Sequence, residues 1–153
     1  MNTRNANLTD ALAISDFVCE LATEHIASSL DEGGLKKLLD GMNVSATEQR
    51  IVDGWPHICA FDGDEFVGVV VAKPPSHLYH LFVRTDRQRA GIGRKLFAMA
   101  DGWSRMESGE CLATVNSSLN AVQVYNQLGF DADGPVVDTE GIVYQPMVRR
   151  NAV

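Results

Sequence analysis

Residues 87–95 read RQRAGIGRK, a basic stretch built around two glycines. From Arg84 to Lys95 there are five basic side chains and one acidic one, a local charge of +4, whereas the whole chain carries −7. The remaining residues therefore carry −11, which would repel a long polyanion such as DNA and an acidic membrane surface. A compact anion can still bind the local positive charge. The sequence predicts a small phosphate-bearing ligand here, and no nucleic-acid or membrane partner.

The residues on either side of this loop predict a strand and then a helix. SHLYHLFV at 76–83 has the composition of a strand, and one face of a helix over 91–106 would carry the apolar residues Ile92, Leu96, Phe97, Ala100 and Trp103. The first turn of a helix has unpaired N–H groups and a partial positive charge, and glycine lets a phosphate approach because it has no Cβ. Neither a dinucleotide fingerprint nor a Walker A loop fits, because Leu96 replaces the third glycine and Gly-Arg-Lys-Leu replaces Gly-Lys-Ser/Thr.

Hydrophobic periodicity in the remaining chain indicates an α+β domain. Before the loop we expect a helix capped by Thr9 or Asp10 and interrupted at 31–34. A short helix ended by Gly41 and a helix begun by a capping box at 45–48 should follow. A hairpin with strands at 57–61 and 65–72 comes next. After it we expect a strand at 110–115, a helix at 118–130 ended by Gly129, and strands at 133–138 and 142–148.

The chain of 153 residues shows no repeat and no linker, so a single domain over 1–153 is expected. It has no apolar run of roughly 18 residues and a polar N-terminus, which predicts a cytoplasmic protein. Cys19, Cys59 and Cys111 are widely spaced and lie in apolar patterns. They are expected to pack in the core, with no disulfide framework and no metal site.

Two sequence motifs occur in the predicted series of strand, glycine loop, helix, strand and helix. Gln88-Arg-Ala-Gly91-Ile-Gly93 follows the strand, and Asn120-Ala-Val-Gln-Val-Tyr125-Asn-Gln-Leu-Gly129-Phe130 comes later. They closely resemble the pyrophosphate loop and the second acetyl-CoA segment of the GCN5-related N-acetyltransferase (GNAT) superfamily. The resemblance covers roughly residues 55–149, and the first 54 match in outline, as a short strand and two or more helices. It implies a mixed, mostly antiparallel sheet of six to seven strands, flanked by helices on both faces and splayed at the central strands.

The resemblance also implies an activity: transfer of the acetyl group of acetyl-CoA to a primary amine by direct attack, with no metal and no acyl-enzyme. In this family the strand before the loop pairs with the pantetheine arm and the loop amides hold the pyrophosphate. These roles fall on Leu81, Phe82 and Val83, and on Gln88, Arg89, Ala90, Gly91, Ile92, Gly93 and Arg94. The 3′-phosphate would meet Arg87, Arg89, Arg94 or Lys95. Asn120 would lie near the pantetheine arm, and Tyr125 would protonate the departing thiolate.

The general base is where this sequence departs from many relatives, which use a carboxylate on the strand at 76–83. No Asp or Glu lies between Glu65 and Asp86, so His77 and His80 are the titratable candidates. By strand alternation His77 shares a face with Tyr79, and also with Leu81 and Val83, whereas His80 points the other way. We favour His77, and His80 or a water relay to a distant carboxylate stays open.

The acceptor would be a small-molecule or peptide amine, and the acidic surplus mildly favours a cationic one. Glu20, Glu24, His25 and Glu48 lie where relatives build the acceptor pocket. The alternative is a non-catalytic acyl-CoA sensor or interaction module on the same fold, which would bind acetyl-CoA yet release no thiol. Nucleic-acid binding by the loop is disfavoured by the −11 remainder and the lack of interleaved aromatic residues. A homodimer is left open.

Overall fold

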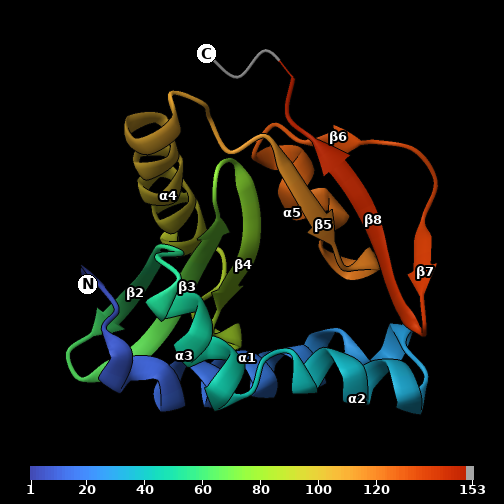
Figure 1. Ribbon diagram of the computed structural model, residues 1–153, viewed down its shortest axis with the longest axis horizontal. Coiled ribbons are helices and arrows are strands. Elements are labelled where there is room, and N and C mark those ends of the chain that lie inside the picture. Colours follow the sequence, from blue (N-terminus) through green and yellow to red (C-terminus); the bar gives the residue numbers. More distant parts are fainter. Residues whose placement is uncertain (151–153) are drawn as a thin grey trace.

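A computed structural model describes residues 1–150, in which helices cover both faces of one mixed sheet (Figure 1). The strands are β1 (Asn2–Asn5), β2 (His57–Asp62), β3 (Glu65–Lys73), β4 (His77–Val83), β5 (Thr114–Ser117), β6 (Asp131–Ala132), β7 (Val137–Thr139) and β8 (Ile142–Val148). The helices are α1 (Ala11–His25), α2 (Glu32–Asp40), α3 (Val44–Val52), α4 (Ile92–Ser108) and α5 (Val122–Gln127), with 3-10 turns η1 (Leu8–Asp10), η2 (Ala27–Ser29), η3 (Thr85–Arg87) and η4 (Leu119–Ala121).

The sheet has the order β1-β2-β3-β4-β5-β8-β6, and β7 pairs with β8. The β4–β5 pair is parallel and every other pair is antiparallel. The predicted α+β class with a mostly antiparallel mixed sheet is therefore confirmed. The sheet has eight strands, one more than the predicted range, because the two-residue β6 adds to β8.

Two apolar layers hold the helices to the sheet. On one face Leu96 and Phe97 of α4 pack with Val70, and on the other Val18 of α1 packs with Cys59. The approach of α4 to the sheet is close: a Cβ on Gly68 would lie 2.9 Å from Cδ1 of Leu96. The start of α4, and with it the glycine loop, is thereby fixed against β3.

The central strands separate from one another. β4 and β5 pair only at His77–Thr114 and Leu78–Val115, and beyond this point no pairing between them is found in the described chain (Figure 1). The expected splay is confirmed. It leaves the second half of β4 with a strand partner on one edge alone, because only β3 continues beside it.

A bulge in β4 overturns one expectation about side-chain direction. Leu78 pairs with Ala72 and His80 with Val71, so Tyr79 is the extra residue. Simple alternation fails as a result: Leu78 and Leu81 both pack in the layer under α4, whereas Tyr79 packs in the layer under α1. Tyr79 therefore does not share a face with Leu81, contrary to the sequence prediction.

Several element ends also differ from the prediction. The first helical turn is capped by Asn7, whose side chain accepts from the Thr9 N–H, and α3 is capped by Asn43 rather than by the box at 45–48. The glycines at 33–34 lie inside α2 instead of interrupting the helices, and β5 begins at Thr114 rather than at 110. No helix within residues 1–150 has the length and hydropathy needed to cross a membrane.

Candidate functional site

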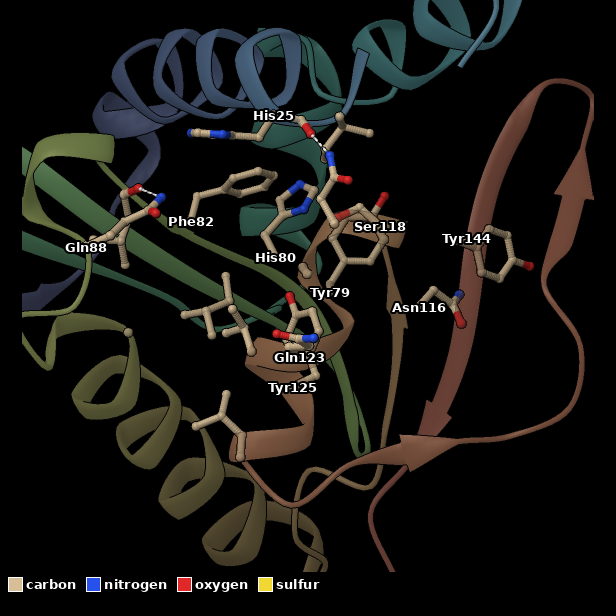
Figure 2. Close-up of a pocket in the computed structure, with 18 of the residues that line it drawn as sticks. His25, Tyr79, His80, Phe82, Gln88, Asn116, Ser118, Gln123, Tyr125 and Tyr144 are labelled. Carbon is tan, nitrogen blue, oxygen red and sulfur yellow. Dashed lines mark hydrogen bonds between the residues drawn. The ribbon is translucent and has the colours of Figure 1, made fainter. Parts of the chain in front are cut away.

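A cleft of about 910 Å³ occupies the gap between β4 and β5. Its walls come from β4, the glycine loop, η4 and α5 on one side, and from the α1–α2 segment and β8 on the other (Figure 2). Of the sequence-predicted site residues, the ones that line it are His25, His77, His80, Leu81, Phe82, Val83, Arg87, Gln88, Arg89, Gly91, Gly93, Arg94, Asn120 and Tyr125. Ala90 is exposed on the loop, and the side chain of Ile92 is buried in the core, so at these two positions only the backbone could serve a ligand.

The glycine loop has a backbone suited to an anion. Gly91 is the N-cap residue of α4 with φ of +86°, a left-handed conformation that favours glycine, and Arg89 has φ of +65°. A Cβ on Gly91 would meet nothing within 4 Å, so this glycine serves conformation and leaves open space around the turn. The N–H groups of the first turn after it, Ile92–Arg94, have no partner within the helix and carry its positive dipole end. Gln88 fastens the loop by donating to the Val83 carbonyl at 3.1 Å.

The basic side chains around the loop divide into two groups. Arg84 and Arg87 form ion pairs with carboxylates, Arg84 with Asp86 and Arg87 with Asp62. By contrast, Arg89, Arg94 and Lys95 have no carboxylate within ion-pair distance in residues 1–150. Arg87, Arg89 and Arg94 line the cleft, and Lys95 does not. Of the side chains suggested for the 3′-phosphate, Arg87 is thus already neutralised.

The backbone of β4 presents an open edge to the cleft. Leu81, Phe82 and Val83 pair with β3 on one side, while β5 has diverged on the other. Backbone N–H and C=O groups that lack a strand partner are normally hydrogen-bonded to another group, because leaving them unpaired away from water costs free energy. An extended ligand arm lying in the cleft could supply them by β-strand addition.

Tyr125 points from α5 into the molecule and lines the cleft with 8% of its surface exposed. Its ring packs edge-on to Phe130 with centroids 6.0 Å apart, and its carbonyl accepts from the Phe130 N–H, so the Gly129–Phe130 stop fixes its position. Burial raises the pKa of Tyr125 to about 12. The phenol therefore stays protonated at neutral pH and is available as a donor.

Asn120 makes a contact that the sequence did not reveal. Its Nδ2 donates to the His25 carbonyl at 2.6 Å and joins η4 to the end of α1. The His25 ring is held in turn at 2.8 Å from the Thr85 hydroxyl, so α1 is tied to both sides of the cleft. Among the suggested acceptor-pocket residues His25 alone lines the cleft, because Glu20 and Glu24 face a separate hollow and Glu48 lies on α3.

The two candidate bases lie in different surroundings. His77 sits where β4 and β5 still pair, with Nδ1 2.8 Å from the Thr114 hydroxyl, and burial, followed by the charge of Lys73, lowers its pKa. His80 is 8% exposed and stacks 4.5 Å from the Tyr79 ring. Its Nε2 is buried and has no hydrogen-bond partner within residues 1–150.

Burial is also the first cause that lowers the pKa of His80 to about 3, and the positive charges of Arg50 and His57 add to it. His77 and His80 are therefore neutral imidazoles at neutral pH. The orphan nitrogen of His80 could not be read from the sequence, because it depends on the bulge at Tyr79.

None of the three cysteines lines the cleft, and burial raises the pKa of Cys59 to about 12. In the described part of the chain, no group of three or more His, Cys, Asp or Glu side chains is arranged to hold a metal ion.

Comparison with known proteins agrees with this geometry. A family model described as an acetyltransferase (GNAT) domain matches residues 26–150. A GCN5-related N-acetyltransferase from Rhodopseudomonas palustris superposes with a TM-score of 0.81 at 18% identity, covering 97% of this chain and 94% of that one. The PaiA N-acetyltransferase of Thermoplasma acidophilum, in complex with coenzyme A, superposes with a TM-score of 0.76 at 16% identity, covering 97% of both chains.

A third structure, of the putative acetyltransferase YncA from Salmonella typhimurium with acetyl-CoA, gives a TM-score of 0.68 at 19% identity, over 97% of this chain and 91% of that one. No curated protein sequence matches. At these identities the solved structures establish the fold, while the family model spans most of the chain. The chain belongs to the GNAT acetyltransferase family.

Proposed function

We propose that the protein is an acetyl-CoA-dependent N-acetyltransferase that acts on a primary amine. The observation that carries the proposal is the junction of two binding features in one cleft: the open edge of β4 and the left-handed Gly91 turn at the start of α4. The first suits an extended arm with amide groups, and the second suits a diphosphate. Coenzyme A thioesters combine both groups in one molecule.

The chain's own residues fit such a ligand. The amides of Gln88–Arg94 would hold the diphosphate, with Arg89 and Arg94 as the free cations beside it. The exposed edge of Leu81–Val83 would pair with the pantetheine arm and bring the thioester towards Tyr125. Two of the structural relatives were solved with coenzyme A or acetyl-CoA, which supports this ligand class.

The proposed chemistry is direct acyl transfer. The amine nitrogen attacks the acetyl carbon, a C–N bond forms and the C–S bond breaks. A backbone N–H of β4 aimed at the carbonyl oxygen would stabilise the negative charge that develops there, an effect worth about 10²–10³ in rate. Tyr125, protonated because burial raises its pKa to about 12, would donate to the sulfur as it leaves.

One observation favours the alternative of a non-catalytic acyl-CoA sensor. No Asp or Glu side chain is among the described residues that line the cleft, and His77 and His80, the two candidate bases, have lowered pKa values. A strong base for an ammonium ion is therefore missing. The presence of Tyr125 within the same cleft favours the enzyme.

Two measurements on the full chain separate the possibilities. Titration calorimetry with acetyl-CoA should register binding, and a thiol-release assay across a panel of primary amines should register turnover with at least one of them. Binding without thiol release for any amine would identify a sensor. Absence of binding to any CoA thioester would remove both forms of the proposal.

A further inference from the structure

The end of the cleft opposite the glycine loop forms a distinct compartment. We define the acceptor chamber as the part between the α1–α2 segment and β8, lined by Ile26, Leu30, Leu38, Met42, Val143 and Tyr144. Figure 2 shows Tyr144 and Asn116 across the cleft from Gln88. With acetyl-CoA bound along β4 and the loop, this chamber is the space left for the second substrate. Its walls are mostly apolar or aromatic.

The chamber has no anionic wall. The chain has 20 Asp and Glu residues, yet none is among the described residues that line the cleft. Lys37, a cation that lines the cleft, is paired with Glu140, whose side chain is 72% exposed and is not among the lining residues. The acidic surplus of the sequence therefore lies elsewhere on the surface and gives no support for a cationic acceptor. Burying an unpaired ammonium group among apolar side chains is costly.

A buried ring nitrogen that can accept a hydrogen bond belongs to His80, a β4 residue that lines the cleft. The His80 ring lines the cleft between Tyr79 and Phe82, and its Nε2 has no partner within residues 1–150 (Figure 2). A buried polar atom left without a hydrogen bond destabilises the protein, so a ligand that donates to it gains the bond without breaking another. The permanent charge near the ring is that of Arg50, which disfavours a second positive charge there. His57, the other titratable neighbour, has its own pKa lowered by burial.

From the apolar lining, the absence of carboxylates and the orphan Nε2 of His80, we infer that the acceptor is a primary amine of low basicity on an apolar body, bound as its free base with an N–H donated to His80. The inference rests on the proposed acetyl transfer. The α-amine of an apolar amino-acid amide or short peptide has these properties, with a pKa of about 7.7–8.0 against about 10.4 for a lysine side chain.

The proton balance agrees with this acceptor. When a free amine attacks the thioester, its nitrogen loses one proton and the departing sulfur gains one, so the sum of amine and thioester gives amide and thiol with no proton left over. An ammonium ion would first have to release a further proton to a base. At pH 7 about a tenth of an amine with pKa near 8 is already free, against fewer than about one in a thousand for an alkylamine.

Matched amines test the inference with acetyl-CoA and the full chain at pH 7. L-Phenylalaninamide and 2-phenylethylamine differ by a carboxamide that lowers the amine pKa. Glycinamide keeps the carboxamide without the apolar body, and spermidine is a polycation. We expect kcat/KM for phenylalaninamide to exceed that of the other three by at least tenfold. Glycinamide and spermidine lack the phenyl group, whose burial is worth at least that factor, and 2-phenylethylamine has a higher amine pKa and so far less free base at pH 7. Raising the pH to 9 should increase the value for 2-phenylethylamine far more than that for phenylalaninamide.

Two variants test the chamber itself. Asn116→Asp replaces an exposed lining residue by its isosteric carboxylate, and we expect it to shift the ratio of kcat/KM towards spermidine by about tenfold. His80→Leu should raise KM for phenylalaninamide at least tenfold with KM for acetyl-CoA unchanged, while His80→Gln, which keeps an acceptor, should retain more of the affinity. If a thermal scan shows that His80→Leu is unfolded, the inference is tested instead by the ratio of kcat/KM for spermidine to kcat/KM for phenylalaninamide in Asn116→Asp.

The outcomes are separable from those of the proposed function. Thiol release that is fastest with spermidine or with 2-phenylethylamine at pH 7 would overturn the acceptor assignment and leave the acetyltransferase standing. An unchanged amine preference in Asn116→Asp would do the same. Acetyl-CoA binding with no thiol release for any of the four amines, or for a wider panel, would instead remove the proposed function.

Discussion

Gly34 of α2 and Gly141 of the β7–β8 turn contact each other through bare backbone. A Cβ on Gly34 would lie 2.0 Å from the Gly141 carbonyl oxygen, and one on Gly141, where φ is +90°, would lie 2.8 Å from a carboxylate oxygen of Asp31. The same Asp31 carboxylate caps α2 by accepting from the Gly34 N–H at 2.7 Å. This contact joins α2 to the start of β8, the two elements that carry the chamber residues Leu38 and Val143 (Figure 1).

The first test is Gly34→Ala. The new methyl group would meet backbone atoms, which cannot move aside as the end of a side chain can, so α2 or the β7–β8 turn must shift. Such overpacking costs about 1–3 kcal/mol and outweighs the roughly 1 kcal/mol that alanine gains over glycine in a helix. We expect a melting temperature lower by a few degrees in thermal unfolding followed by circular dichroism.

Gly33→Ala is the matched control for this change. Gly33 is the neighbouring residue of the same helix, is exposed, and its Cβ would meet only a carboxylate oxygen of Asp31 at 3.5 Å, an ordinary contact. Here the helix propensity acts alone, so the melting temperature should stay the same or rise. Equal melting temperatures for the two variants would contradict the close contact with Gly141.

Tyr125→Phe tests the proposed acid. The substitution keeps the ring that packs against Phe130 and removes the hydroxyl, so stability should change little. We expect kcat to fall by about 10²–10⁴, while KM for acetyl-CoA stays within a few-fold, because the hydroxyl serves the departing sulfur rather than binding. Full activity with the preferred amine would show that the leaving thiolate is protonated by another group.

The division of the basic loop residues leads to a third test. Arg94 and Arg87 both line the cleft, but Arg87 is paired with Asp62 of β2, whereas Arg94 has no carboxylate partner within residues 1–150. Arg94→Gln should weaken CoA binding about fivefold to tenfold in calorimetry, a typical loss for a partly exposed charge-assisted hydrogen bond. Arg87→Gln should leave the dissociation constant within twofold.

Dephospho-CoA shows which phosphate is involved. If Arg94 meets the 3′-phosphate, its substitution should leave the affinity for dephospho-CoA unchanged; if it meets the diphosphate, both ligands should be weakened equally. The same comparison with Arg89→Gln assigns the second free cation of the cleft. If Arg87→Gln weakened CoA binding more than Arg89→Gln and Arg94→Gln, the assignment of Arg89 and Arg94 as the ligand-binding cations would be refuted.

The sequence was sufficient for the fold and for the glycine-loop half of the cleft, because both depend on local patterns. Glycines at 91 and 93, a strand before them and an amphipathic helix after them define the loop without tertiary information. The Gly129–Phe130 stop likewise fixed the end of the Tyr125 helix, and Phe130 is fully buried as expected.

The acceptor half was not predictable because it depends on tertiary relationships. The bulge at Tyr79 changes which side chains of β4 face α1, and no residue pattern indicates it. The glycines at 33–34 suggested an interruption, since nothing local shows that Gly34 meets a turn more than a hundred residues away. Similarly, the acidic surplus of the chain suggested a cationic acceptor, but its distribution over the surface leaves the cleft without a carboxylate.

A last prediction concerns acid stability and the end of β8. Arg149, with 10% of its side chain exposed, pairs with Asp101 of α4 at 3.1 Å, and the same carboxylate accepts from the Leu112 N–H at 2.7 Å. Burial alone would raise the pKa of Asp101, but this N–H, Arg105 and Arg149 together lower it below its ordinary 3.8. A carboxyl group with a lowered folded-state pKa contributes stability that is present above its unfolded pKa and lost as the pH falls through the folded one.

Asp101→Asn should therefore destabilise the protein by about 2–4 kcal/mol at pH 7 in urea unfolding, because Arg149 is left as a largely buried, unpaired charge. The difference from the unaltered chain should stay constant between pH 7 and 5 and shrink below about pH 3.8, where the carboxyl group of the unaltered chain takes up its proton. Asp62→Asn, which removes the exposed partner of Arg87, is the control and should change stability little. A constant difference down to pH 2 would mean that the ion pair with Arg149 does not link α4 to β8.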